Sequence, residues 1–256
     1  MESNVQAVAQ TLMRARKTHR QADAHGSAEW VLDSADEACA VQDAMGRELD
    51  WWRDGVPGHW KTGAANLQAL QTSSPLPDAG IWSSGRDAQS WPMHQRGVES
   101  EIAFRTARAV TAQEAATLDA DTACGVIDAM TVAIELVDFR WQQEMGAPEW
   151  LKLADLQSHG ALVLGAWIPF AARDWSAQIC RTVIGDQAEV RRTGTHSLGD
   201  PTLVLPGWLR HATARFGTVP AGTVVTTGTW VGLLFAHAGD LVRAEFDGIG
   251  AVSVRV

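Results

Sequence analysis

Apolar positions recur at helical spacing near the start of the chain. Ser3 and Gln6 have the spacing of a helix cap, and apolar residues follow at intervals of three and four. This predicts an amphipathic helix over residues 3–20. Ser34 opens a second stretch of the same kind, which predicts another helix over residues 34–55. We expect the two helices to form a small N-terminal lobe, residues 1–56, packed on a β-rich main domain, residues 57–256.

Alternating and continuous apolar runs, typical of strands, dominate the rest of the chain. Residues 132–138 and 160–167 are short apolar runs, and residues 242–246 and 252–256 alternate on either side of an Asp-Gly turn. Residues 72–84 contain proline and glycine at close intervals, which predicts an irregular loop. Shorter helices are predicted at residues 111–118, 121–128, 148–155 and 208–216.

The alternation at residues 98–104 places two carboxylates together. If this segment is extended, Glu99 and Glu101 share one face, while the apolar residues that follow face a core. Like charges this close call for a cation, a proton or open water. Carboxylate oxygens are the ligands that Mg²⁺ or Mn²⁺ prefers, and the alternative is a solvated sheet face.

A third acid, Glu135, lies within the apolar run at residues 132–138. In a buried strand such a carboxylate must face a cleft, a partner or an ion, and in an edge strand it faces water. Glu135 is therefore the natural third metal ligand beside Glu99 and Glu101.

Two further segments carry candidate catalytic groups. Residues 59–63 lie near two glycines and read as a short strand with His59 and Lys61 on one face. A lysine near acids could hold a substrate carboxylate or exchange a proton. Residues 155–160 form a polar connection in which His159 is a candidate proton carrier.

Composition narrows the class of protein. Hydrophobic residues at 46% and charged residues at 20% indicate a folded chain, and the net charge of -9 argues against nucleic acid as a partner. The three cysteines are widely spaced and predict neither disulfides nor a zinc site, which fits a cytoplasmic protein. No apolar stretch is long enough to predict a membrane span. With no tyrosine in the chain, proton transfer must use lysine, histidine, carboxylate, thiol or water.

Together these residues resemble the fumarylacetoacetate hydrolase superfamily, in its branch of 2-keto-4-pentenoate hydratases and 4-oxalocrotonate decarboxylases. The resemblance covers about residues 34–256. It rests on Ala-Val-Gln at 40–42, Trp-Lys-Thr-Gly at 60–63, Val-Glu-Ser-Glu-Ile-Ala-Phe at 98–104, Glu-Leu-Val-Asp-Phe-Arg at 135–140, Val-Leu-Gly at 163–165, Ala-Gly-Asp at 238–240 and Gly-Ile-Gly at 248–250.

The resemblance implies an α+β fold, a mixed β-sheet roll like the C-terminal domain of fumarylacetoacetate hydrolase, with peripheral helices and the N-terminal helical lobe. It implies a homo-oligomer, with Glu99, Glu101 and Glu135 holding Mg²⁺ or Mn²⁺. Lys61 and Asp155 match positions of the family's active site. The run at 156–159 and Phe139 are bulkier than the family pattern, so we expect both to alter the pocket floor.

The expected activity is a metal-dependent hydratase that adds water to a 2-hydroxy-2,4-dienoate or its keto tautomer in aromatic meta-cleavage catabolism. Lys61 would bind the carboxylate or move a proton, and Asp155, His159 or His59 would orient water. The alternatives are decarboxylation of a 2-keto diacid and hydrolysis of an acylpyruvate C–C bond. A non-catalytic subunit that stabilises a paralogous decarboxylase, with its pocket filled by Phe139 and His159, is the alternative from another class.

Overall fold

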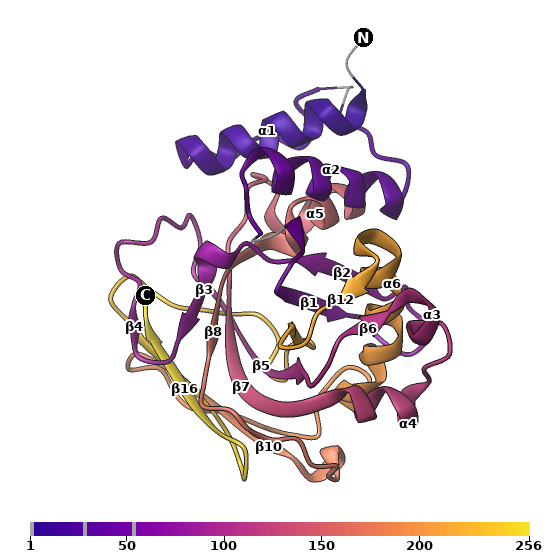
Figure 1. The fold of residues 1–256 in the computed structure, drawn as a ribbon. Coiled ribbons are helices and arrows are strands. Elements are labelled where there is room, and N and C mark those ends of the chain that lie inside the picture. Colours follow the sequence, from indigo (N-terminus) through magenta and orange to yellow (C-terminus); the bar gives the residue numbers. More distant parts are fainter. Residues whose placement is uncertain (1–2, 28–29, 53–54) are drawn as a thin grey trace.

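The computed structural model describes residues 3–27, 30–52 and 55–256, and it shows a mixed β-sheet roll with helices at its periphery (Figure 1). The fold class expected from the sequence, an α+β roll of this kind, is confirmed. Its helices are α1 (Asn4–Thr18), α2 (Ala35–Glu48), α3 (Ala112–Ala115), α4 (Ala120–Ala123), α5 (Glu149–Ala154) and α6 (Leu205–Phe216). Its strands are β1 (His59–Gly63), β2 (Thr72–Pro75), β3 (Ile81–Ser83), β4 (Arg86–Asp87), β5 (Gly97–Thr106), β6 (Val110–Thr111), β7 (Ile127–Val137), β8 (His159–Leu164), β9 (Ile168–Pro169), β10 (Ile179–Ile184), β11 (Val190–Thr193), β12 (Thr218–Val219), β13 (Val224–Thr226), β14 (Leu234–Phe235), β15 (Leu241–Phe246) and β16 (Gly250–Arg255).

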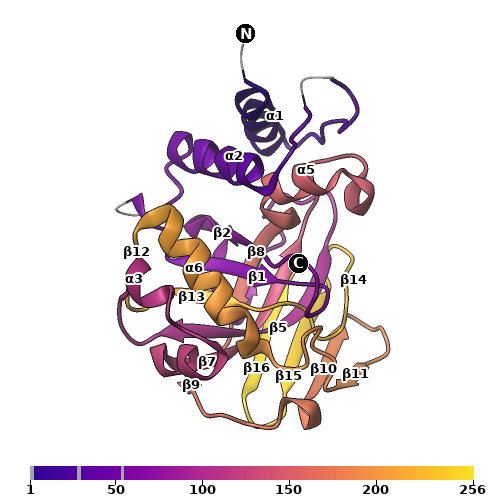
Figure 2. The same cartoon turned by 90° about the vertical axis from the view of Figure 1, so that its right-hand side faces the viewer.

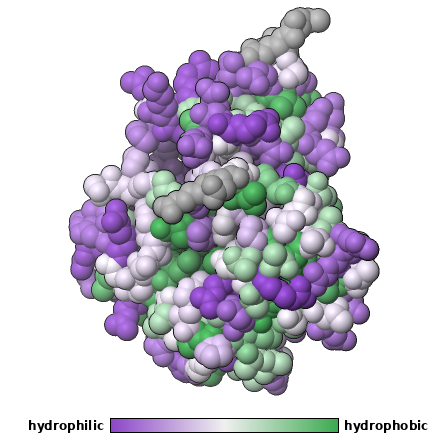
Figure 3. Space-filling model, viewed as in Figure 1, coloured by the Kyte–Doolittle hydropathy of each residue, from purple (hydrophilic) through white to green (hydrophobic). Residues whose placement is uncertain are grey.

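The N-terminal helices α1 and α2 cap one end of the roll together with α5 (Figures 1 and 2). Ser3 and Ser34 cap them as expected, each accepting a hydrogen bond from the backbone N–H three residues later. A buried apolar cluster from all three helices, including Leu12, Met45 and Leu151, joins them. The exposed side of this helical end is largely hydrophilic (Figure 3).

The main sheet carries the site. In the described residues its strand order is β2-β1-β13-β5-β7-β8-β3, with β14 on β5 and β9 on β7. The two longest strands, β5 and β7, pair in antiparallel register through the middle of this sheet. A second sheet, β11-β10-β15-β16-β4, packs against the apolar face of the first. Helix α6 lies near the β2 edge of the main sheet (Figure 2). The core between them includes Phe104, Trp208 and Phe246.

Several boundaries differ from the sequence prediction. The second helix was expected to reach residue 55, but it ends at Glu48, and Asp50 then takes a left-handed φ of 48°. Residues 53–54 of that expectation lie outside the described part of the chain. The loop expected at residues 72–84 contains strands β2 and β3, which pair with the preceding strand β1 and with the distant strand β8. The helix expected over residues 121–128 is the short α4, because β7 begins at Ile127.

Candidate metal centre

The three acidic residues singled out in the sequence meet on one face of the main sheet. Glu99 lies directly opposite Glu135 in the register of β5 and β7, and Glu101 follows two residues later on the same face. One ligand oxygen from each lies within 4.8 Å of the other two. Octahedral Mg²⁺ spans about 4.2 Å between opposite ligands, from its bond length of about 2.1 Å, so a single ion fits this spacing.

Burial makes this cluster costly without a cation. Glu135 is fully buried and Glu101 is only 2% exposed. Burial, together with repulsion from the neighbouring carboxylates, raises the pKa of Glu99 to about 8 and that of Glu101 to about 7. The Oε2 atom of Glu135 is buried and has no hydrogen-bond partner among the described residues. These features fit a divalent cation, which would supply the missing positive charge and a partner for that oxygen.

Strand β13 fixes Glu101. This strand pairs with β5 from the side opposite β7, which brings Thr226 next to the glutamate. The hydroxyl of Thr226 and the backbone N–H of Gly228, at 2.8 Å, both donate to Glu101 Oε2. These donors favour the ionised carboxylate and hold the side chain in place. They leave the other oxygen of Glu101 available to bind a metal ion.

Lys61 is the cation nearest the cluster. It projects from β1, as the alternation predicted, and its Nζ donates to Glu135 Oε1 at 2.7 Å and to the backbone oxygen of Gln157 at 3.2 Å. Burial alone would lower its pKa, but Glu135, Glu99 and Glu101 raise the pKa of Lys61 above its ordinary value. The lysine is therefore an ammonium group at neutral pH and can bind an anion or donate a proton.

His159 contacts the same carboxylate oxygen of Glu135 as Lys61 does. Its Nδ1 is 2.9 Å from Glu135 Oε1, and the ring is 1% exposed. Burial lowers the pKa of His159. Burial alone would raise the pKa of Glu135, but Lys61 and His159 hold the pKa of Glu135 below its ordinary value. The pair is thus a neutral imidazole whose Nδ1–H donates to an ionised carboxylate.

A left-handed turn places the residues between Asp155 and His159. Leu156, Gln157 and Ser158 have φ values of 54°, 53° and 62°, a conformation that side chains other than glycine and asparagine rarely adopt. The turn directs the carbonyl of Gln157 to Lys61 and brings Gln157 and Ser158 to the wall of the metal cavity. No glycine or asparagine in the sequence signals this turn.

Asp155 lies apart from the metal cluster. It is fully buried and forms ion pairs with Arg140 at 2.7 Å and Arg16 at 3.0 Å. It does not line the cavity beside the carboxylates. Its contacts are those of a structural residue that connects α1, the end of α5 and the segment after β7, and its catalytic role stays a prediction.

The cavity that opens onto the carboxylates has a volume of about 330 Å³. Gln157 and Ser158, from the run at 156–159 that was expected to alter the pocket floor, line this cavity. Phe139 and His159 do not line it: Phe139 is buried elsewhere, and His159 bonds Glu135. The sequence offered no signal for several lining residues, since they come from distant loops. Its walls include Lys61, Thr62, Glu99, Glu101, Val137, Met145, Gln157, Ser158, Ser197, Gly228, Thr229 and Leu233.

The family follows from this fold and from the sequence together. The model of the fumarylacetoacetate (FAA) hydrolase C-terminal family matches residues 81–256, so the chain belongs to the fumarylacetoacetate hydrolase family. A search of curated protein sequences found no match. Among the described residues, no helix combines the length and apolar character needed to cross a membrane.

Solved structures share the fold at low sequence identity. A 4-oxalocrotonate decarboxylase from Pseudomonas putida G7, complexed with magnesium and adipate, has 18% identity and a TM-score of 0.82 over 98% of this chain and 96% of its own. A 2-hydroxyhepta-2,4-diene-1,7-dioate isomerase from Mycobacterium marinum has 18% identity and a TM-score of 0.60 over 77% of this chain and 73% of its own. A 5-carboxymethyl-2-hydroxymuconate delta-isomerase from Mycobacterium smegmatis has 22% identity and a TM-score of 0.57 over 77% of both chains.

Proposed function

We propose that the chain is a divalent-metal-dependent hydratase that adds water to a 2-hydroxy-2,4-dienoate or its keto tautomer. Glu99, Glu101 and Glu135 would hold Mg²⁺ or Mn²⁺. The observation that carries this proposal is the buried Oε2 of Glu135, to which no described residue donates a hydrogen bond. When bound, the ion would supply Lewis-acid stabilisation of negative charge on a 2-oxo acid.

The chain's own residues would divide the remaining work. Lys61 is a buried ammonium at the cavity wall, so it can hold the substrate carboxylate or deliver a proton to substrate carbon. His159 is a positioning residue, because its Nδ1–H fixes the carboxylate of Glu135 from behind. Ser158, Ser197 and Thr229 offer hydroxyl groups at the same wall that can orient a water molecule.

Similarity to named enzymes supports the substrate class. The solved structures with this fold include a decarboxylase and isomerases named for unsaturated hydroxy or keto diacids. A cavity of about 330 Å³ is large enough for a small dienoic acid. We therefore propose a small 2-keto or 2-hydroxydienoic acid as the substrate, within aromatic catabolism.

Decarboxylation of a 2-keto diacid is the second candidate. The 4-oxalocrotonate decarboxylase matches 98% of this chain, including the N-terminal helices, whereas the two isomerases match 77%. Both reactions use the same stabilisation of enolate charge, so the metal ligands do not distinguish them. Cytoplasmic location, a homo-oligomeric state, association with a paralogous decarboxylase and the division into a helical lobe and a catalytic domain are further proposals.

The test is a panel of 2-hydroxydienoates, 2-keto diacids and acylpyruvates, assayed with and without Mn²⁺. Loss of dienol absorbance without carbon dioxide supports hydration, carbon dioxide release supports decarboxylation, and paired acid products support C–C hydrolysis. Glu101→Ala should lower metal-dependent turnover at least about a hundredfold, since it removes a ligand from the charge-stabilising site. The matched control is Glu189→Ala at an exposed position, and turnover independent of both metal and Glu101 would contradict the proposal.

A further inference from the structure

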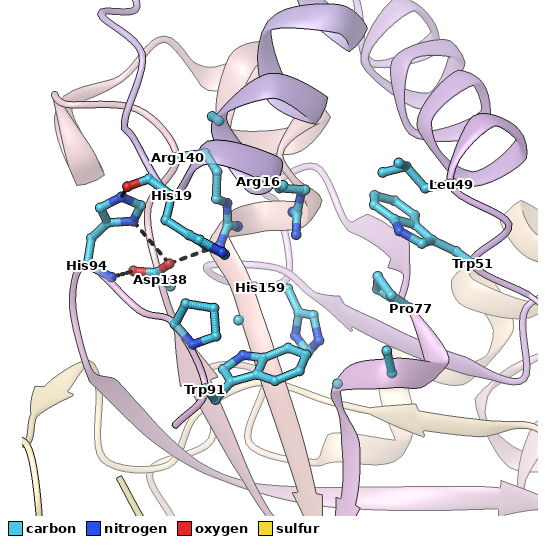
Figure 4. A pocket seen from close by; sticks show the side chains of 15 residues that line it. Arg16, His19, Leu49, Trp51, Pro77, Trp91, His94, Asp138, Arg140 and His159 are labelled. Carbon is cyan, nitrogen blue, oxygen red and sulfur yellow. Dashed lines mark hydrogen bonds and ion pairs between the residues drawn. The ribbon is translucent and has the colours of Figure 1, made fainter. Parts of the chain in front are cut away.

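A second cavity lies behind the metal centre, between the N-terminal helices and the roll (Figure 4). Its volume is about 340 Å³, and none of its lining residues lines the metal cavity. His159 lines this second cavity while its Nδ1 bonds the metal-site carboxylate of Glu135. One histidine therefore connects the second cavity to a carboxylate of the metal centre.

The imidazole of His159 lines this cavity and bonds through only one of its two ring nitrogens among the described residues. Its Nε2 is buried and has no hydrogen-bond partner among the described residues. Because the Glu135 carboxylate engages Nδ1, Nε2 is the ring nitrogen left for a ligand, and a hydroxyl group can form a hydrogen bond with it. A buried polar atom of this kind costs free energy when it stays unpaired, which favours a molecule that can donate to it.

Two guanidinium groups face the same space. Arg16 from α1 and Arg140 after β7 reach the cavity opposite His159 and Trp91 (Figure 4). They share Asp155, and the Nε of Arg16 is buried and has no hydrogen-bond partner in the part of the chain that the structure describes. Burial, and then repulsion by Arg140, lowers the pKa of Arg16 to about 10. One further anion beside Arg16 would provide a partner for Nε and would offset the lowering of the pKa of Arg16.

The other carboxylate in the cavity is already occupied. Asp138 Oδ1 accepts the backbone N–H groups of His94 and Gln95 at 2.8 Å each. Its Oδ2 lies 3.4 Å from His94 Nδ1 and 3.7 Å from an Arg140 nitrogen. Asp138 thus binds the loop at residues 94–95 and Arg140. The carboxylate that pairs with Arg16 is that of Asp155.

Apolar and aromatic side chains form the rest of the wall. The indole rings of Trp51 and Trp91 lie on opposite sides of the view, with Leu49 above Trp51 and Pro77 below it (Figure 4). Such a lining favours a ligand with an aromatic or apolar body and only a few polar groups.

We propose that this cavity is a second small-molecule site that binds a hydroxycarboxylic acid with an apolar body. The carboxylate pairs with the guanidinium of Arg16, the hydroxyl donates to His159 Nε2, and the body lies between Trp51 and Trp91. This site is separate from the proposed hydratase reaction. A molecule bound in this site would contact His159, which in turn bonds Glu135, a carboxylate that we assign to the metal.

The test uses mandelate, which has a carboxylate, a hydroxyl group and an aromatic ring, titrated into the full chain by calorimetry. The titration is done in EDTA with the Glu101→Gln variant as well as the wild type, so that chelation at the metal centre cannot contribute. We expect saturable binding that is weakened at least about tenfold for phenylacetate, which lacks the hydroxyl group, and for methyl mandelate, which lacks the charge.

Variants locate the site. Arg16→Gln should weaken mandelate binding at least about tenfold, whereas Arg14→Gln, an exposed arginine on the same helix, should not change it. Ala79→Trp, at an exposed lining position, should block the cavity without altering the core, and it tests the site even if Arg16→Gln does not fold. His159→Phe should abolish the preference for mandelate over phenylacetate.

Each of three results would overturn this proposal. The first is the absence of saturable binding, as expected if water alone fills the cavity. The second is equal affinity for all three probes in the wild type. The third is an affinity that neither Ala79→Trp nor Arg16→Gln changes. Loss of hydratase activity tests a different site, because these titrations need neither metal nor turnover.

Discussion

Lys61 is the residue whose role is most constrained by its surroundings. Its ammonium donates to Glu135, and the nearby carboxylates raise its pKa despite burial. A lysine in this state is not a general base at neutral pH. The two roles considered from the sequence, binding a substrate carboxylate and delivering a proton, both require the charged form. The group also lies close enough to the carboxylates to repel a bound cation.

Lys61→Met should therefore separate catalysis from metal binding. Turnover should fall about a hundredfold or more, because the substrate loses its cationic partner or proton donor. Mn²⁺ should bind at least as tightly as in the wild type at about pH 8.5, since one positive charge has left a site of three carboxylates. Stopped assays and Mn²⁺ titration measure the two effects, with exposed Lys17→Met as the control. Parallel loss of metal and activity would show that Lys61 only supports the ligands.

At the scale of elements, Asp155 connects three separate segments. Its carboxylate is fully buried between Arg140 and Arg16, so helix α1 is tied to the end of α5 and to the chain after β7. Removing one member of a buried ion pair leaves the others without compensation, which typically costs about 3–5 kcal/mol. This is a structural consequence that a residue acting only in catalysis would not have.

Asp155→Asn should accordingly lower the free energy of unfolding by about 3 kcal/mol or more. Urea denaturation followed by fluorescence measures the change, and Asp186→Asn at an exposed position is the matched control. If Asp155→Asn instead abolishes turnover while the unfolding midpoint stays unchanged, the carboxylate has the catalytic role that the family resemblance suggested.

Elements with local signals were predicted well from the sequence. The caps at Ser3 and Ser34 and the C-terminal hairpin depend on residues a few positions apart, and the structure confirms them. Strand β2 was missed because it is defined by pairing with β1 rather than by its own composition. The turn at residues 156–158 was missed because its left-handed backbone is imposed by surroundings, including the contact with Lys61.

The site as a whole depends on the closing of the roll. Register between β5 and β7 brings Glu135 to Glu99, and pairing of β13 with β5 brings Gly228 to Glu101 from more than a hundred residues away. Alternation within one strand predicted the shared face of Glu99 and Glu101. The partners from β13 and the position of His159 behind Glu135 could not be read from spacing, because they arise from long-range strand pairing.

Gathering acids inside the fold makes the stability of the metal-free molecule depend on pH. Folding raises the pKa of Glu99 from its ordinary value of 4.5 to about 8, so the folded chain binds this proton more tightly than the unfolded chain does. The contribution of such a group is fully present below its unfolded pKa and is lost as the pH rises through its folded pKa. The metal-free protein should therefore lose stability from this source between about pH 4.5 and pH 8.

Glu99→Gln, which is neutral at every pH, should avoid that loss. In EDTA, the Tm of this variant minus the Tm of the wild type should increase between about pH 6 and pH 8.5, while exposed Glu189→Gln should show a constant difference. Added Mn²⁺ should reverse the order, since a ligand at a hundred times its Kd stabilises the wild type by about 2.7 kcal/mol and the variant has lost a ligand. A Tm difference for Glu99→Gln that depends on neither pH nor metal would mean that Glu99 faces water rather than a shared ion, and the three-carboxylate site would lose its basis.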